Sequence, residues 1–173
     1  MAALTKALFV LVLVLDVTAA SAAEFPPRKA GLWILSMKPP DGRTVSMQQC
    51  VDAKTDAALQ SMSGGMAQRA CSKRDIQRSG DTITIDSVCT IAGRTRTAHA
   101  VITGSFDSNY TMVMTSQGEG TPTRSTTMTA KWTGPCAVGQ KPGDVIMANG
   151  FKMNILEMRN GTGRPGVAEP PSR

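Results

Sequence analysis

Aromatic residues are scarce in this chain, where four phenylalanines, two tryptophans and one tyrosine make up 4% of the 173 residues. Proteins that hold single-stranded nucleic acid stack its bases on aromatic side chains placed among basic ones. A nucleic-acid partner is therefore not expected, although the net charge is +6 at pH 7. The positive excess favours other anionic partners, such as an acidic polymer of a cell envelope.

Histidine is nearly absent as well, because His99 is the single one in the chain. A catalytic triad or a histidine-rich metal site needs several such groups together. The sequence also has no Gly-x-Ser-x-Gly nucleophile motif, and no spaced pair of carboxylates stands out. We therefore expect a protein that is not an enzyme and that needs no cofactor.

Long apolar runs are missing too, and none approaches the roughly 20 residues of a membrane helix. The most apolar stretch, residues 7–18, follows the basic residue Lys6 and precedes the small residues Ala20-Ser21-Ala22. A positive start, a short apolar run and a cleavage site are the three parts of an export signal. Residues 1–23 are therefore predicted to be a signal peptide, and the mature protein is expected to be periplasmic or secreted, without a membrane span.

The four cysteines are widely spaced, and the nearest two are 18 positions apart. Structural zinc sites usually place cysteines two to four residues apart, and thioredoxin-like redox sites use Cys-x-x-Cys. We therefore expect no metal at these residues. In an exported protein, Cys50, Cys71, Cys89 and Cys136 are expected to form two disulfides.

Spacing alone allows three ways to pair these cysteines. A hairpin brings Cys71 close to Cys89 if a bulge of one residue shifts Cys71 away from Thr90. Cys50 would then bond to Cys136. The alternative scheme joins Cys50 to Cys71 and Cys89 to Cys136, and it stays open at this level.

The first part of the mature chain reads as a hairpin followed by a helix. Residues 31–38 are predicted to form a strand, Pro39-Pro40-Asp41-Gly42 a turn, and residues 44–51 the antiparallel partner. Asp52 is a suitable N-cap for a short helix over residues 53–60. The Ser63-Gly64-Gly65 sequence should end this helix, because glycine disfavours helical backbone.

From Cys71 to Thr133, short β-branched runs separated by turn residues predict an antiparallel meander. Two-residue turns at Gly80-Asp81 and Gly93-Arg94, and a three-residue turn at Ser108-Asn109-Tyr110, would set its register. These turns predict that the following residues lie opposite each other: Ile76 and Ile85, Ile85 and Ile102, Cys89 and Ala98, Phe106 and Met112, and Met128 and either Met112 or Met114.

This register gives the meander one apolar and one polar face. The apolar face is predicted to carry Ile83, Ile85, Cys89, Ile91, Ile102, Phe106, Met112, Met114, Met128, Ala130 and Trp132. The polar, water-covered face is predicted to carry Thr82, Thr84, Asp86, Thr90, Thr97, His99, Thr103, Thr115, Thr127, Thr129 and Lys131. Because an apolar face must be covered, we expect a mainly β fold: a curved antiparallel β-meander or small open barrel with one short helix and two disulfides.

The disulfide-stabilised β domain is predicted to span residues 24–140. Residues 141–158 are expected to form a short C-terminal extension, in which Val145–Met147 pairs with Phe151–Met153 around Asn149-Gly150 or forms a short helix. Residues 159–173 are rich in glycine, proline and charge, which predicts a disordered tail.

Several short motifs occur in a recognisable order: Gly31-Leu32-Trp33 opens a strand, Met47-Gln48-Gln49-Cys50 precedes the helix, and Trp132-Thr133-Gly134-Pro135-Cys136 follows the meander. Together with Cys71 and Cys89, this order resembles the family of small exported bacterial proteins classed as domain of unknown function 3617. The resemblance covers about residues 28–136. It implies a periplasmic or secreted protein with no established activity.

The leading functional hypothesis is a non-enzymatic domain that binds a small apolar molecule or an envelope component beside its curved sheet. Methionine-rich surfaces can repack around varied ligands. The candidate ligand-facing residues are Phe106, Met112, Met114, Met128 and Trp132. One alternative is a structural or protein-interaction module that meets an anionic envelope polymer, and a less favoured one is a methionine-based Cu(I) site.

Overall fold

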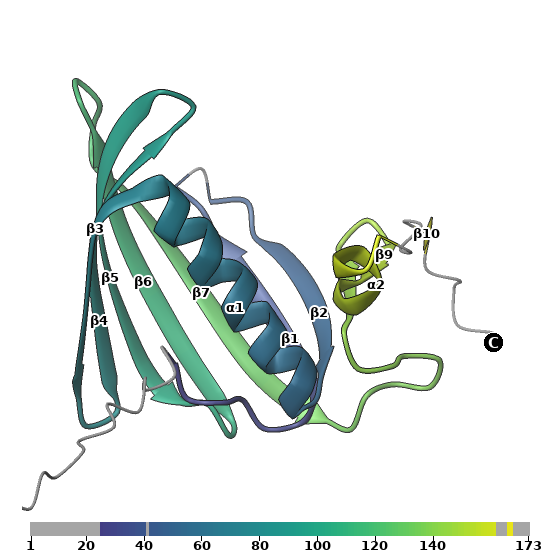
Figure 1. The fold of residues 1–173 in the computed structure, drawn as a ribbon. Coiled ribbons are helices and arrows are strands. Elements are labelled where there is room, and N and C mark those ends of the chain that lie inside the picture. Colours follow the sequence, from purple (N-terminus) through teal and green to yellow (C-terminus); the bar gives the residue numbers. More distant parts are fainter. Residues whose placement is uncertain (1–24, 41, 162–165, 168–173) are drawn as a thin grey trace, which may run out of the picture.

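A computed structural model describes residues 25–40, 42–161 and 166–167 (Figure 1). The predicted signal peptide, residues 1–23, lies outside these residues. Within them, ten strands form one antiparallel sheet in the order β10-β9-β8-β2-β1-β7-β6-β5-β4-β3. The strands are β1 (Gly31–Lys38), β2 (Val45–Val51), β3 (Cys71–Ser79), β4 (Thr82–Ile91), β5 (Arg94–Ser105), β6 (Asn109–Gly118), β7 (Arg124–Gly134), β8 (Asp144–Met147), β9 (Phe151–Asn154) and β10 (Gly166–Val167).

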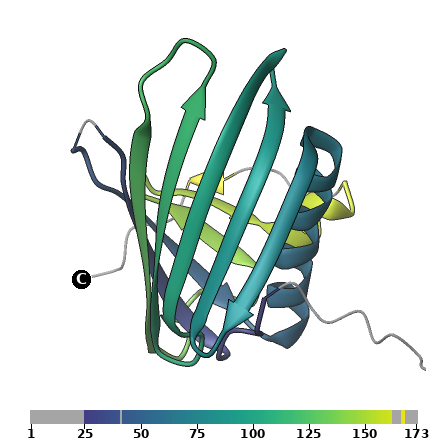
Figure 2. The same cartoon turned by 90° about the vertical axis from the view of Figure 1, so that its left-hand side faces the viewer.

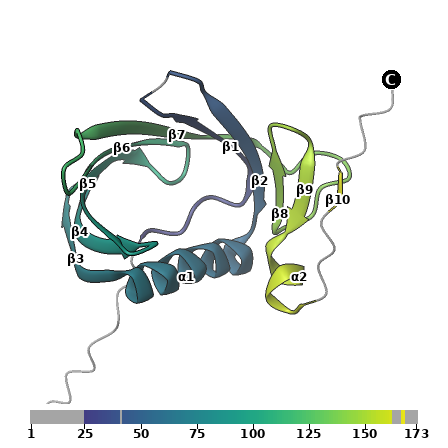
Figure 3. The same ribbon diagram turned by 90° about the horizontal axis from the view of Figure 1, so that it is seen from above.

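Strands β1 to β7 curve around one side of the longer helix, α1 (Ala53–Ala70) (Figure 3). The helix contacts β2 near one end of this curve and β3 and β4 at the other. It thereby spans the concave face of the sheet, which the sequence predicted to be apolar. The predicted class, a mainly β fold with a curved antiparallel sheet, a covering helix and two disulfides, is confirmed.

Helix α1 is longer than predicted, because it continues through Gly64 and Gly65 to Ala70 instead of ending near Gln60. Its start is fixed by a capping box: the Asp52 carboxylate accepts from Thr55 N at 2.8 Å, and the Thr55 hydroxyl accepts from Asp52 N at 2.9 Å. A helical glycine costs only about 1 kcal/mol. Packing across the sheet outweighs that cost.

The predicted hairpins are confirmed at both ends of the meander. Strand β1 pairs with β2, Ile76 lies opposite Ile85, and Met128 lies opposite Met112. Figure 2 shows the convex face of the sheet, and the register places the hydroxyl-bearing side chains on this face. Along it, one row of hydroxyl side chains runs from β3 to β2: Ser79, Thr82, Thr103, Thr111, Thr129, Ser36 and Ser46.

Two predicted turns were wrong. The β4–β5 turn is Ala92-Gly93, one residue earlier than expected, and both residues have positive φ, as tight hairpin turns require. The β5–β6 turn contains Phe106, which was expected within a strand. Ile85 therefore lies opposite Ala100, Cys89 opposite Arg96, and Met112 opposite Ile102.

Both errors shift the register by an even number of residues, so each side chain stays on its predicted face. The concave face accordingly holds the main core. Its buried members are Trp33, Leu35, Val51, Ile83, Ile102, Tyr110 and Ala130. This core leaves a cavity under α1, which is described below.

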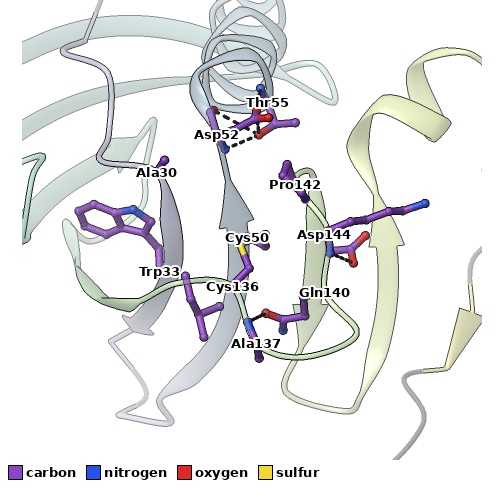
Figure 4. The surroundings of a disulfide bond; sticks show 12 residues. Ala30, Trp33, Cys50, Asp52, Thr55, Cys136, Ala137, Gln140, Pro142 and Asp144 are labelled. Atoms are coloured by element: carbon purple, nitrogen blue, oxygen red, sulfur yellow. Dashed lines mark hydrogen bonds between the residues drawn. A yellow bond between two sulfur atoms is a disulfide. The ribbon is translucent and has the colours of Figure 1, made fainter.

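Both disulfides follow the first of the two pairing schemes given above, not the alternative one. Cys71 bonds to Cys89 across β3 and β4, next to the register shift that the pairing requires. Cys50 bonds to Cys136 and ties β2 to the segment that follows β7 (Figure 4). Beside it, Gly143 N donates to Cys50 O at 2.8 Å. The two bonds are compatible with an extracytoplasmic protein.

Of the two alternatives predicted for the C-terminal extension, the structure has the hairpin and not a helix over the same residues. Strands β8 and β9 form a hairpin with Val145 opposite Met153, and α2 (Ile155–Arg159) follows. Val145 and Ile155 pack with Ala58 of α1 in a second, smaller core. Part of the tail predicted to be disordered departs from that expectation, because Gly166 and Val167 pair with the edge of β9. Residues 162–165 and 168–173 lie outside the described residues.

None of the helices in the described part of the chain is long and apolar enough to cross a bilayer.

Candidate functional site

A cavity of about 360 Å³ lies between α1 and the concave face of the sheet; we call it the α1 cavity. Its sheet wall is mainly apolar, and polar side chains come from α1, β2, β3 and the segment before β1. The lining residues are Phe25, Arg28, Leu35, Gln49, Asp56, Leu59, Gln60, Ser63, Arg74, Ile102, Phe106, Tyr110, Met112 and Met128. This volume falls in the range of small-molecule sites.

Aromatic side chains line one end of the α1 cavity. Phe106, in the β5–β6 turn, stacks on Tyr110 with ring centroids 4.5 Å apart, and Tyr110 lies 5.8 Å from Trp33. The segment before β1 is held at this end, because Lys29 N donates to Phe106 O at 2.9 Å. Phe106 therefore lines the α1 cavity from the β5–β6 turn, not from within a strand as predicted.

A buried ion pair joins the same segment to α1. Arg28 donates to Asp56 through Nε at 2.7 Å and through its backbone N at 2.9 Å. Gln49 Oε1 accepts from Arg28 at 2.8 Å, and Gln60 donates to Asp56 at 3.0 Å. Asp56 is 0% exposed. These groups satisfy one another's hydrogen-bonding capacity. They thereby fix the segment before β1, residues 25–30, which we call the lead segment, against α1.

Burial also affects two other groups in the lining. It raises the pKa of the Tyr110 phenol above its ordinary value, while the positive charge of Arg28 acts in the opposite direction. Burial lowers the pKa of the Arg74 guanidinium, which nevertheless remains charged at neutral pH. The cavity therefore offers a neutral hydroxyl at Tyr110 and a partly desolvated cation at Arg74.

The five predicted ligand-facing residues are divided by the structure. Phe106, Met112 and Met128 line the α1 cavity, whereas Met114 and Trp132 do not. Met114 lies one row further along the sheet, opposite Ala100 and Thr126.

Trp132 lies opposite Trp33 on β1 instead of near the methionines. Its indole N–H donates to Ala30 O at 3.0 Å, and the Lys29 ammonium lies 3.9 Å from the centre of its ring. Trp132 therefore holds the lead segment in place. That the other three residues contact a ligand stays a prediction.

The polar lining residues were missed by the sequence reasoning. Arg28 and Asp56 are 28 positions apart and belong to an irregular segment and a helix, so no periodic pattern connects them. Arg74 could have been predicted, because it lies two residues before Ile76 on β3 and must therefore share its face of the sheet. The strand alternation was the signal that could have identified it.

The convex face carries a second, polar groove of about 400 Å³ across β4, β5 and β6. His99 lies there, on the polar face as predicted, with Nδ1 2.8 Å from the Asp86 carboxylate. Both side chains are half exposed. No cluster of three or more histidine, cysteine or acidic side chains suited to a metal occurs among the residues described.

A family model described as "Protein of unknown function (DUF3617)" matches residues 28–136. The chain belongs to the DUF3617 family. Neither a curated protein nor a solved structure matches the chain.

The matched DUF3617 region begins at Arg28 and ends at Cys136. It therefore contains the Arg28–Asp56 ion pair, both disulfides and every residue that lines the α1 cavity except Phe25. The C-terminal extension with β8, β9 and α2 lies beyond the match. The cavity is thus a feature of the DUF3617 region rather than of the extension.

Proposed function

We propose that this DUF3617 protein is an exported, non-enzymatic domain that binds a small apolar molecule in the α1 cavity. The observation that carries this proposal is the cavity itself, with Ile102, Met112 and Met128 on its sheet wall. A core filled by its own side chains would instead favour a purely structural or protein-interaction module. Flexible methionine side chains suit a site that adapts to its ligand.

Export is part of the proposal and is supported by the signal-like N-terminus and the two disulfides. A binding role without catalysis is supported by the polar groups in the lining. Arg28, Asp56 and Gln49 are hydrogen-bonded to one another, so their arrangement serves to hold the fold. Tyr110, with its raised pKa, is a poor general base.

The proposal can be tested with N-phenylnaphthylamine, a neutral apolar dye whose fluorescence rises on leaving water. The oxidised protein should bind this dye with saturation at one equivalent. Ser63→Trp should abolish binding, because Ser63 lies on the cavity side of α1 and a bulky side chain there would fill the space. Ser61→Trp is the matched control, since Ser61 is an exposed serine of the same helix outside the lining.

Equal dye binding by both tryptophan variants would contradict the cavity as the binding site. No dye binding by the wild-type protein would favour the structural or interaction module instead. Native mass spectrometry of protein purified from its own host gives a second readout. An adduct carried by the wild type and by Ser61→Trp, but not by Ser63→Trp, would identify the natural ligand by its mass.

A methionine-based Cu(I) site is a second candidate, favoured by one observation. Met37 lies opposite Met128, which lies opposite Met112, so three soft thioether ligands share one row of the sheet. Cu(I) retained by the wild type against a colorimetric chelator, and lost from Met128→Leu, would support it; equal loss from both would exclude it.

A further inference from the structure

The sheet separates its charged residues by type. In β3 to β7, the register places every arginine on the concave face: Arg74, Arg78, Arg94, Arg96 and Arg124. The same alternation places the lysines and acidic residues of these strands on the convex face: Lys73, Lys131, Asp75 and Asp86. The concave face therefore carries positive charge in one chemical form, the guanidinium group.

Two of these arginines lie at the ends of a single row of the sheet. From β3 to β7, the row reads Arg74, Ser87, Ala98, Ser116 and Arg124. The three residues between the arginines are small.

A third arginine lies in the next row, where Arg96 is opposite Gly118. A Cβ atom at Gly118 would lie 3.5 Å from Arg96 Cγ, so the missing side chain accommodates the arginine stem. We call Arg74, Arg96 and Arg124 the rim arginines.

One of the rim arginines reaches the apolar part of the α1 cavity. Arg74 itself lines the cavity, together with Met112 and Met128. The row of Met112 and Met128 and the row of Arg74 and Arg124 are separated by one row, that of Met114 and Thr126. An apolar chain and a charged head could therefore be held on the same face of the sheet, two rows apart.

We infer that the ligand of the α1 cavity is an anionic amphiphile. Its alkyl chain packs against Met112 and Met128, and its oxyanion head, a carboxylate or a phosphate, binds Arg74 and the other rim arginines. This inference rests on the proposed binding function and adds the chemical class of the ligand. Guanidinium groups bind carboxylates and phosphates through paired, charge-assisted hydrogen bonds, and they do so more readily than ammonium groups in partly desolvated places.

The Arg28–Asp56 ion pair does not compete for this role. Arg28 is engaged by the Asp56 carboxylate and by Gln49, and its side chain is 8% exposed. It lies with β2 and the start of α1, whereas Arg74 belongs to β3. The α1 cavity therefore contains a polar cluster whose members bond to one another, and Arg74 lies on a different strand from that cluster.

The inference can be tested by displacing N-phenylnaphthylamine from the oxidised full-length protein with four ligands of equal chain length. These are dodecanoate, dodecyl phosphate, dodecanol and dodecyltrimethylammonium. At least one of the two anions should compete roughly tenfold more strongly than dodecanol, and the cation should be the weakest, as expected for a gained charge-assisted contact. The ratio between dodecanoate and dodecyl phosphate identifies the preferred head group.

Two double variants distinguish the effect of the rim arginines from the effect of the protein's overall charge. Arg74→Gln with Arg124→Gln removes two cations from the concave face, and Lys73→Gln with Lys131→Gln removes two from the convex face of the same strands. The first variant should lose the tenfold preference for the anion over dodecanol. The second should keep this preference.

Each outcome has a distinct meaning. If the dye does not bind the wild type, the proposed function fails. If the dye binds but dodecanol competes as well as both anions, or if both double variants lose the preference equally, only the inference about the head group fails. Should the Arg74 variant not fold, Arg124→Gln alone decides, because Arg124 is exposed: an unchanged preference overturns the role of the rim.

Discussion

Two aspartates of this molecule have a partner with a side-chain nitrogen at nearly the same distance but differ in their surroundings. Asp56 binds Arg28 at 2.7 Å with side chains 1% and 8% exposed, whereas Asp86 binds His99 at 2.8 Å with both half exposed. Breaking a buried pair leaves an uncompensated charge in a place without water, whereas water replaces a lost partner at the surface. The two positions should therefore respond very differently to the same substitution.

We predict that Asp56→Asn lowers the free energy of unfolding by about 3 kcal/mol, because it leaves the buried Arg28 charge unpaired. Asp86→Asn, the matched control on the convex face, should cost less than about 1 kcal/mol. Urea denaturation followed by tryptophan fluorescence measures both values. Equal losses in the two variants would mean that the Arg28–Asp56 pair is not the buried tie described above.

A third aspartate, Asp144, gives a prediction about pH. Burial alone would raise its pKa, but hydrogen bonds from Lys152, Asn154 and the Lys141 backbone N outweigh this and lower the pKa below 3.8. Because the folded-state pKa lies below the unfolded one, the stability that ionised Asp144 contributes is present above pH 3.8 and is lost as the pH falls through the folded-state value.

Asp144→Asn should therefore lower the free energy of unfolding by about 2 kcal/mol at neutral pH. The difference from the wild type should stay constant down to about pH 5 and narrow below pH 3.8. Urea titrations at several pH values measure this difference. A gap that widens in acid would reverse the sign of the argument and contradict it.

At the level of single residues, the sequence was sufficient to predict the position of side chains in strands, where alternation applies, but not of those in irregular segments. Met112 and Met128 were placed on the correct face because strand side chains alternate with a period of two. The pairing of Arg28 with Asp56 follows instead from how an irregular segment crosses a helix, for which the sequence has no period. The apolar wall of the cavity was thus predictable, and its polar cluster was not.

At the level of elements, the longest departure from expectation is the second half of α1. The helix passes through Gly64 and Gly65, where composition predicted an end. Packing between the two ends of the curved sheet stabilises a segment whose own propensity is poor. A substitution that improves this propensity should therefore stabilise the protein without altering its fold.

We predict that Gly65→Ala raises the free energy of unfolding by up to about 1 kcal/mol. A Cβ atom at Gly65 would make only an ordinary contact, 3.7 Å from the Arg69 side chain. Gly104→Ala is the opposing control, because Gly104 has a φ of +109° and its Cβ would lie 2.6 Å from Asn109 O. Thermal unfolding should show a higher midpoint for the first variant and a lower one for the second. A lower midpoint for Gly65→Ala would argue against a continuous helix.

The strand pairings show why faces were easier to predict than partners. The assumed turns were displaced by one residue at Ala92-Gly93 and by two at Phe106 to Ser108. Moving an antiparallel turn by one position shifts every opposite residue by two, which changes the partner but preserves the face. The predicted core residues therefore lie on the correct face, although most of the residue pairs predicted for β5 and β6 were wrong.

At the level of the whole molecule, the two disulfides act over very different lengths of chain. Cys50 and Cys136 are separated by 86 residues and join β2 to the segment that follows β7, so their bond ties the first hairpin to the chain just beyond the meander. Cys71 and Cys89 are separated by 18 residues within one hairpin. In the chain-entropy account, the longer loop restricts the unfolded chain more strongly.

We predict that replacing Cys50 and Cys136 by alanine lowers the free energy of unfolding by about 4 to 5 kcal/mol, and that replacing Cys71 and Cys89 lowers it by about 3 kcal/mol. Urea denaturation of the two double variants against the oxidised wild type measures both losses. Loss of the longer link should also weaken binding of the neutral dye, because the bond holds β2, which carries Gln49 in the wall of the α1 cavity. The shorter link closes a hairpin that β4 already pairs along its length, so its removal should leave dye binding nearly unchanged. The opposite order of losses would mean that native packing around Cys71, rather than restriction of the unfolded chain, dominates the contribution of these bonds.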